Sequence, residues 1–330
     1  MKKRLIKILF KMLAITLLLL TVIGFVILNY AASDIASPEP TEIPSGSASV
    51  LENPAVANLR IQELICMDGK VPTLVVEPEP DKSLPLSKKS SLIREQLSER
   101  GRSLSPHGSI QGTVVILHGR NGRKEHGIGI AERFCAVGLR CILLDLPSHG
   151  ESPVENVQFG VTDWEKSIPY EVLTECSNKL GFNPKKVALW GMSMGGSFAN
   201  AAVSHPEHGH IWNSLTIVCS FDSLDKVIQK KCKLGWLTKI TSKLCQMHGG
   251  PDFSKVRPVD WVNEISQPVL VVHGDQDDLI PASSGKALYE GYHSKKKKWL
   301  TVEDGNHNNI LITPMPLYAE MADWVLENFE

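Results

Sequence analysis

Short apolar runs alternate with amphipathic stretches along most of the chain after residue 58. The runs at 59–67 and 71–77 flank Asp68-Gly69, a dipeptide typical of tight hairpins, so they predict two paired strands. Further strands are predicted at residues 113–117, 141–144, 187–190, 215–219, 269–272 and 299–302. Helix-compatible segments lie between them, at residues 124–137, 163–180, 193–203, 283–290 and 316–328. Such alternation predicts an α/β fold, with a mostly parallel sheet and helices on both faces.

The N-terminal pattern is different, because residues 12–30 carry no charge and residues 12–28 form an apolar run long enough to cross a bilayer. A basic segment, residues 1–11, precedes it, whereas the next basic residue after it is Arg60. The positive-inside rule therefore predicts a single-pass membrane protein with a cytoplasmic N-terminus and its main domain on the non-cytoplasmic side. A cleaved secretory signal is the alternative, since Ala31 and Ser33 are small, but the length of the run favours an uncleaved signal-anchor.

The remaining boundaries follow from composition. Residues 31–57 are rich in Pro and Ser and are interpreted as a stalk that needs no fold, and residues 58–330 as one globular domain. Within the domain, residues 78–112 break the strand and helix pattern, apart from a possible short helix at residues 91–100, and are interpreted as a surface insertion. Residues 222–260 interleave lysines with apolar residues; a helical cap is favoured, with contact to a membrane surface or an acyl chain as the alternative.

Composition excludes some classes of function. Net charge is −1, so no general basic excess favours nucleic acid as a partner. The seven cysteines lack C-x-x-C spacing and are expected to be free thiols, although Cys232 and Cys245 are close enough in sequence to pair in an oxidising compartment. His205, His208 and His210 form an H-x-x-H-x-H pattern, but no cysteine or further carboxylate spacing supports a metal site, and none is predicted.

Candidate chemistry centres on Gly191-Met192-Ser193-Met194-Gly195, which lies between a predicted strand and a predicted helix. A serine at such a sharp turn is strained, and flanking glycines relieve the crowding and leave the hydroxyl exposed. Asp277 and His307 follow later strands, so all three side chains are expected at the carboxyl edge of the sheet. A serine hydroxyl is a weak nucleophile unless an imidazole takes its proton and a carboxylate orients the imidazole.

With these residues in place, the chain resembles the α/β-hydrolase superfamily of serine esterases, lipases and thioesterases, which also includes aminopeptidase-type hydrolases. The family's nucleophile matches Ser193, its acid falls on Asp277 within residues 273–281, and its histidine falls on His307 within residues 305–309. Residues 145–152 resemble the family's D-x-x-G-x-G-x-S turn, with Ser148 where a glycine is common. Asp275 and Asp278, neighbours of Asp277, remain alternatives for the acid.

The resemblance implies a serine hydrolase that cleaves carboxylic esters or thioesters through an acyl-enzyme, with no cofactor. It implies an oxyanion hole formed by the backbone N–H groups of Met194 and Arg120. The expected partners are a small-molecule or lipid-like ester and the membrane that holds the N-terminal helix. Two alternatives stay open: a serine peptidase of the aminopeptidase type, and a non-catalytic member that uses the same cleft to bind a ligand or partner.

Overall fold

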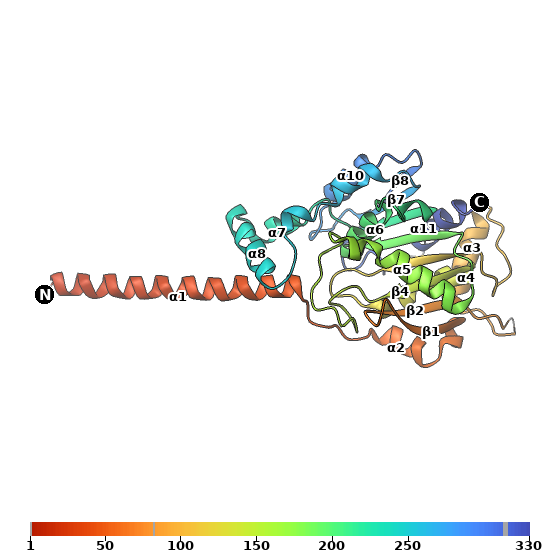
Figure 1. Ribbon diagram of the computed structural model, residues 1–330, viewed down its shortest axis with the longest axis horizontal. Coiled ribbons are helices and arrows are strands. Elements are labelled where there is room, and N and C mark those ends of the chain that lie inside the picture. Colours follow the sequence, from red (N-terminus) through yellow and green to blue (C-terminus); the bar gives the residue numbers. More distant parts are fainter. Residues whose placement is uncertain (1, 82, 313–315) are drawn as a thin grey trace.

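The computed structural model describes residues 2–81, 83–312 and 316–330. Its centre is an eight-stranded sheet in the order β1-β2-β4-β3-β5-β6-β7-β8 (Figure 1). The hairpin strands β1 (Leu59–Cys66) and β2 (Val71–Pro78) are antiparallel, and β2 is antiparallel to β4 (Leu139–Leu144). Parallel pairing joins the others: β3 (Gly112–Leu117), β5 (Val187–Met192), β6 (Ser214–Val218), β7 (Val269–Gly274) and β8 (Lys297–Val302). The predicted fold class is confirmed.

Helices cover both faces of this sheet and create two cores. One core includes residues of α5 (Asp163–Leu180), α6 (Met194–Val203) and α10 (Ala282–Gly291), and the other those of α3 (Lys88–Glu99), α4 (Ile128–Ala136) and α11 (Pro316–Glu327). In β3, Val115 and Leu117 enter the first core while Val114 and Ile116 enter the second. A strand buried on both faces has no polar side to show, which explains its continuous apolar sequence.

The first helix, α1 (Lys2–Ala36), projects from the domain as a long rod (Figure 1). Its segment Arg4–Ala36 contains an 18-residue stretch with a mean hydropathy of 2.5 and is long and apolar enough to cross a membrane. Large apolar side chains stay exposed along it as far as Tyr30. Ala32, Ile35 and Ala36, in contrast, are buried in the first core. The potential span therefore continues without a break into the folded domain.

Residues 31–57 differ from the stalk without a fold that their composition suggested. They contain the end of α1, a helix α2 (Ser45–Glu52) and a 3₁₀ turn η1 (Pro54–Ala57). Pro44 and Pro54 lie at the starts of α2 and η1, where a missing N–H costs nothing, so these prolines mark helix starts. The hydroxyl of Ser47 is buried and donates to the Glu125 carbonyl (2.7 Å), which fixes α2 on the domain.

Residues 78–112 contain the short helix that the sequence suggested at residues 91–100, although it begins earlier, at Lys88, and packs into the core instead of lying on the surface. Helix α3 packs against α4 and α11, with Ile93 and Leu97 fully buried. Ser87 caps its N-terminus by accepting from the Ser90 N–H, and the guanidinium of Arg94 donates to two backbone carbonyls. Ile93 and Leu97, four positions apart on one face of the helix, close this end of the second core.

The cap within residues 222–260 is helical, as expected. It contains α7 (Leu224–Cys232), α8 (Gly235–Met247), the turn η4 (Phe253–Lys255) and α9 (Pro258–Trp261). Helix α8 packs against the last turns of α1, where His248 Nε2 lies 3.0 Å from Asn29 Oδ1. Cys232 and Cys245 are both free. The cap and the end of α1 thus form one packed unit on the same side of the domain (Figure 1).

Candidate active site

Ser193 lies in the turn between β5 and α6. Its φ and ψ angles are 53° and −117°, a left-handed conformation that costs energy for a residue with a side chain. The turn is held from both sides, because the Ser193 N–H donates to the Val218 carbonyl (2.9 Å) and the Ser220 hydroxyl donates to the Ser193 carbonyl (2.9 Å). The structure therefore has Ser193 in the strained turn that the sequence predicted.

The glycines on either side of Ser193 make this turn possible. A Cβ atom on Gly191 would lie 2.3 Å from the Gly195 carbonyl oxygen, and one on Gly195 would lie 2.2 Å from the Leu117 carbonyl oxygen. Both contacts involve backbone, which cannot yield cheaply. Helix α6 then begins at Met194, whose N–H, as one of the first in the helix, has no acceptor within it.

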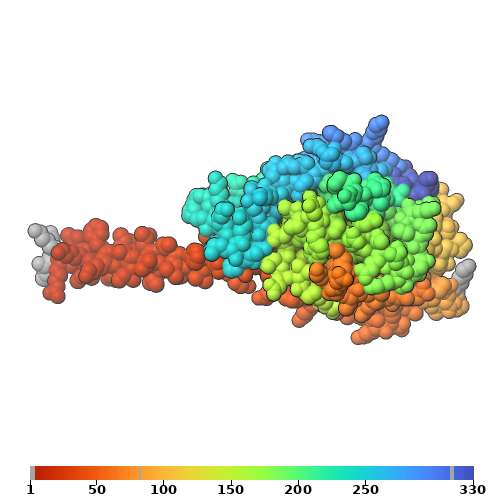
Figure 2. Space-filling view, in the orientation of Figure 1, coloured from red at the N-terminus to blue at the C-terminus, as the bar shows by residue number. Residues whose placement is uncertain are grey.

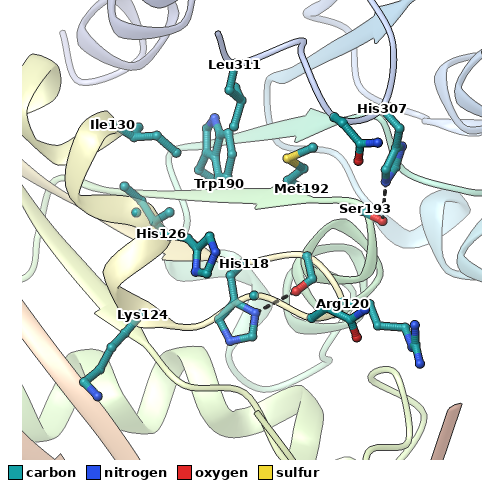
Figure 3. Close-up of a pocket in the computed structure, with 16 residues that line it drawn as sticks. His118, Arg120, Lys124, His126, Ile130, Trp190, Met192, Ser193, His307 and Leu311 are labelled. Carbon is teal, nitrogen blue, oxygen red and sulfur yellow. Dashed lines mark hydrogen bonds between the residues drawn. The ribbon is translucent and has the colours of Figure 1, made fainter. Parts of the chain in front are cut away.

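His307 lies between Ser193 and Asp277. Its Nε2 is 3.0 Å from the Ser193 hydroxyl oxygen, and its Nδ1 is 2.8 Å from Asp277 Oδ2. A carboxylate at Nδ1 favours the tautomer that carries the proton there, which leaves Nε2 free to accept the serine proton (Figure 3 shows the bond to Ser193). All three side chains are largely buried, so the arrangement is shielded from bulk water.

The loop after β7 brings Asp277 to the imidazole and turns its two neighbours away. Asp277 Oδ1 accepts the N–H groups of Leu279 (3.1 Å) and Ile280 (2.8 Å), while Asp275 and Asp278 are exposed. Burial alone would raise the pKa of Asp277. The His307 imidazole and the Ile280 N–H lower this pKa by more than burial raises it, so the net pKa lies below its usual value. Asp277 therefore stays ionised beside the imidazole.

The loop after β3 contains Arg120, the second expected oxyanion donor. The Gly119 carbonyl is held by His118 Nδ1 (2.8 Å) and by the Gly122 N–H (3.0 Å), as Figure 3 shows for His118. Because the peptide is trans, the Arg120 N–H is directed away from that carbonyl. The loop also approaches the serine closely, since a Cβ on Gly119 would lie 3.3 Å from Ser193 Cβ.

His118 orients this peptide as a neutral imidazole. Burial lowers its pKa to about 4, and its Nε2 accepts the Leu146 N–H (3.1 Å). With Nε2 accepting, Nδ1 carries the proton that holds the Gly119 carbonyl. These two contacts make His118 an anchor of its turn.

The Arg120 side chain reaches an unexpected partner on the N-terminal helix. Its Nη2 donates to the backbone carbonyl of Asp34 (2.8 Å) and to Asp34 Oδ2 (2.5 Å). The end of α1 is therefore tied to the loop that carries the second candidate oxyanion donor. Asp34 lies in the segment 31–57, whose composition had suggested a stalk without a fold.

A first cavity, here called the core hollow, opens beside the serine on the side of β3 and β5 (Figure 3). It holds about 300 Å³ and its apolar wall is formed by Ile116, Ile130, Trp190, Met192 and Leu311. All of these come from the sheet, from α4 or from the segment after β8. Its size suits a short apolar group.

A second cavity, here called the cap hollow, opens on the other side and holds about 530 Å³. Ala31 and Ile35 of α1 form one wall, and the cap residues Leu224, Val227 and Ile228 form another. The two hollows share five residues around the candidate nucleophile: Arg120, Asn121, Ser193, His307 and Asn308. A bound molecule with two arms is thus accommodated on both sides of one hydroxyl.

The turn at residues 145–152 is hydrogen-bonded to the segment that follows β3 and so supports the loop that contains Arg120. Ser148 has φ of 64°, so it occupies the left-handed position where the resembled family often has glycine. Its hydroxyl donates to the Glu155 carbonyl (2.8 Å), which offsets part of the strain. Asp145 accepts the backbone N–H groups of Lys124 (2.7 Å) and Glu151 (2.9 Å) and thereby joins this turn to the segment after β3.

Comparison with known proteins gives the same picture. The model of the prolyl oligopeptidase family matches residues 170–330. The uncharacterized protein YqkD of Bacillus subtilis is 25% identical over 239 residues, which cover 69% of this chain and 75% of YqkD. Human protein ABHD12B is 23% identical over 240 residues, 64% of this chain and 60% of that protein.

Solved structures extend the likeness to the whole domain. A Pyrococcus furiosus esterase, Pf2001, superposes with a TM-score of 0.62 at 16% sequence identity, covering 90% of this chain and 98% of that one. A membrane phospholipase A, described as a bacterial virulence factor, superposes with a TM-score of 0.53 at 14% identity, covering 97% and 99% of the two chains. Its sheet order, the strained turn at Ser193 and these likenesses show that the chain has the α/β-hydrolase fold.

Proposed function

We propose that this protein is a serine hydrolase that cleaves carboxylic esters or thioesters through an acyl-enzyme. The observation that carries the proposal is the unbroken hydrogen-bond chain from Ser193 through His307 to Asp277. In the first step the Ser193 hydroxyl attacks the substrate carbonyl while His307 Nε2 takes its proton, and the ionised Asp277 stabilises the imidazolium. The N–H groups of Met194 and Arg120 would hold the oxyanion.

The second half of the cycle returns the proton. His307 gives it to the departing alcohol or thiol as the tetrahedral intermediate collapses, and a water molecule then attacks the acyl-enzyme with His307 as general base. The two hollows that meet at Ser193 offer separate places for the acyl group and the leaving group. A substrate with two apolar arms, as in a lipid-like ester, uses both.

An amide substrate with a free amino terminus is the second candidate, because the prolyl oligopeptidase family model covers residues 170–330. Binding such an ammonium group calls for a free carboxylate near the serine. Among the described residues that line the two hollows, Asp34 is the only carboxylate, and Arg120 already binds it. This observation favours the ester.

The proposal includes an uncleaved anchor with the domain on the non-cytoplasmic side. Cleavage after Ser33 would remove Ala31 from the cap hollow and Ala32 from the core, whereas an intact α1 keeps both. The charge asymmetry around the apolar run supports the orientation. N-terminal sequencing of the mature protein tests the first point, and a reporter fused after Glu330, which should behave as translocated, tests the second.

The test of catalysis uses the full chain in nanodiscs. We expect a fluorophosphonate probe to label Ser193 and a short-chain p-nitrophenyl ester to be hydrolysed. Ser193→Ala should lose both while keeping its melting temperature, and Ser283→Ala, at an exposed serine away from the hollows, should keep both. Labelling of another serine, or unchanged turnover in Ser193→Ala, would contradict the assignment. Labelling without turnover of any ester or thioester would leave an activated serine with a different substrate.

A further inference from the structure

The outward face of α8 carries apolar side chains that the domain leaves uncovered. Trp236, Ile240 and Met247 are 60%, 39% and 80% exposed, and Leu234, just before the helix, is 49% exposed. Their spacing places Trp236, Ile240 and Met247 on one side of the helix. The opposite side, with Thr238, Thr241 and Cys245, is buried. An exposed apolar row on a packed helix indicates a surface that binds something apolar.

The cap that carries this row is strongly basic. Six lysines and one acid lie between Leu224 and Met247. Lys226 pairs with Asp222, but the part of the chain that the structure describes offers no carboxylate partner to the others closest to the row: Lys231, Lys233, Lys239 and Lys243. Apolar residues flanked by unpaired lysines match a membrane surface that contains anionic lipid.

The position of α8 along α1 indicates that the membrane in question is the bilayer that α1 itself would span. Lys11 is the last charged residue before the apolar run, and about 20 helical residues are needed to cross the hydrocarbon core, so a span that begins at Met12 ends near Ala31. Helix α8 packs on this part of α1, since Leu28 borders the core and Asn29 lies beside His248. The row is therefore held at the depth where the hydrocarbon of the spanned bilayer ends.

Figures 1 and 2 show the same relation in space. The cap extends past the rest of the domain along α1, toward the N-terminus, and its atoms lie against the helix where it leaves the domain. A bilayer crossed by α1 therefore meets the cap before it meets the sheet or the helices of the second core.

We propose that the outward face of α8 docks into the surface of the bilayer that α1 spans, with Trp236, Ile240 and Met247 in the interface and the cap lysines on anionic headgroups. The cap hollow lies between α7 and the end of α1, the two helices against which α8 packs. Docking brings the hollow to the membrane, so an ester reaches Ser193 from the lipid phase. The docking rests on the span, and the route of the ester rests also on the proposed hydrolase activity.

The binding test does not depend on activity. Full chain with Cys232→Ser and one added cysteine, Trp236→Cys, Ile240→Cys or Met247→Cys, is labelled with the environment-sensitive dye NBD in nanodiscs containing phosphatidylglycerol. Val56→Cys is the control, because Val56 is also 63% exposed but lies on η1. Spin-labelled phospholipid should quench the dye at 236 and 240 at least about twofold more than at 56.

Equal, weak quenching at all positions would overturn the proposal. Weak quenching together with efficient crosslinking of the same cysteines between two copies would also overturn it and assign the face to a second copy of this chain. The lipid dependence is tested with Lys239→Glu and Lys243→Glu, which should reduce quenching in anionic nanodiscs more than in phosphatidylcholine nanodiscs. The same loss in both lipids would contradict the role of the lysines.

The activity test separates docking from catalysis. Trp236→Ser with Ile240→Ser should lower the hydrolysis of an ester embedded in vesicles about tenfold and leave a water-soluble short-chain ester unchanged. Equal loss on both substrates, or on neither, would contradict entry from the lipid phase. If wild-type protein hydrolyses neither ester, the proposed function fails, while the quenching result still decides the docking.

Discussion

The two hollows open on the same hydroxyl but are built from different kinds of segment. The walls of the core hollow stand on β3, β5 and α4, whose positions are fixed by strand pairing and by a fully buried core. The walls of the cap hollow come from α1, α7 and the loop that contains Phe159, which lie outside the sheet. One side of the site is therefore part of the scaffold, and the other is assembled from additions to it.

This difference implies a division of labour. A wall fixed by the sheet tolerates little change in shape, because interiors are close-packed and a change of one methylene is felt. The wall that α1 forms can change its position when the surroundings of α1 change, because this helix also has the properties of a membrane span. We expect the core hollow to impose a fixed size limit on one arm of the substrate, and the cap hollow to vary in affinity for the other arm with the state of the anchor.

The largest expected effect concerns what the hollows share. Asp277→Asn should lower kcat about 10⁴-fold, because an amide at this position favours the wrong tautomer of His307. The loss should be the same for esters extended on either arm. Asp275→Asn is the matched control and should change kcat less than about threefold, since Asp275 is exposed. Stopped-flow or steady-state kinetics on both variants checks this, and a reversed order would move the triad acid to Asp275.

The next effect separates the hollows by pH. Glu165 accepts the N–H groups of Gln158 (2.7 Å) and Gly160 (2.7 Å) and so holds the loop that places Phe159 in the cap hollow. Burial raises the pKa of Glu165 to about 7 from an ordinary value of 4.5. Between these values the folded chain binds a proton that the unfolded chain has lost, so stability from this group falls as pH rises from 4.5 to 7.

The size of that fall is about 3 kcal/mol at most, from the difference in pKa. We expect the melting temperature of wild-type protein to drop between pH 5 and pH 8 relative to that of Glu165→Gln, which carries no titratable group at position 165. Binding in the core hollow should not follow this profile. Parallel pH dependence of the melting temperature in the two proteins would show that Glu165 does not titrate in this range.

The scaffold side was predictable from sequence for a physical reason. Strands such as β3 and β5 are buried on both faces and appear as unbroken apolar runs, and Ser193, Asp277 and His307 each follow such a run. Their order along the chain, with the parallel sheet, was enough to bring them to one edge. The hydrogen bonds that select Asp277 over its neighbours were not predictable, because they depend on the loop conformation after β7.

On the cap side, the helical cap was expected, but the wall that α1 forms was not predictable, because its sequence signals are weak locally. Ala32 and Ala36 are small residues followed by Pro38 and Pro40, a composition typical of a linker. Their burial depends on α8, which is more than about 200 residues away in sequence, and such long-range packing leaves little trace in periodicity. Ala31, Asp34 and Ile35 do recur at helical spacing, which would have extended the helix past residue 30.

A pair of substitutions that fill the hollows should have intermediate effects. Met192→Trp places an indole ring in the core hollow, and Ala31→Trp places one in the cap hollow. Each should lower kcat/KM about 10- to 100-fold for esters elongated on one arm and leave short esters nearly unchanged. The decisive measurement is a matrix of acyl lengths against alcohol lengths. Loss on the same arm in both variants would contradict the separate roles of the hollows, and Val56→Trp controls for general effects.

The smallest expected effect tests the tie between α1 and the oxyanion loop. Asp34→Asn removes the charge that binds Arg120, but the Asp34 carbonyl still accepts from the guanidinium, so the loop should keep its place. The two side chains are 39% and 26% exposed, and such partly exposed pairs contribute about 0.2–1 kcal/mol. KM for an ester with a long arm in the cap hollow should therefore rise at most about fivefold, with kcat unchanged.

Salt should weaken wild-type binding toward the level of the variant and leave the variant unaffected. Asp225→Asn, at an acid of α7 outside the hollow, is the control. A large fall in kcat instead would show that the pair orients the Arg120 N–H itself, and the end of the anchor would then belong to the catalytic machinery as well as to the substrate wall.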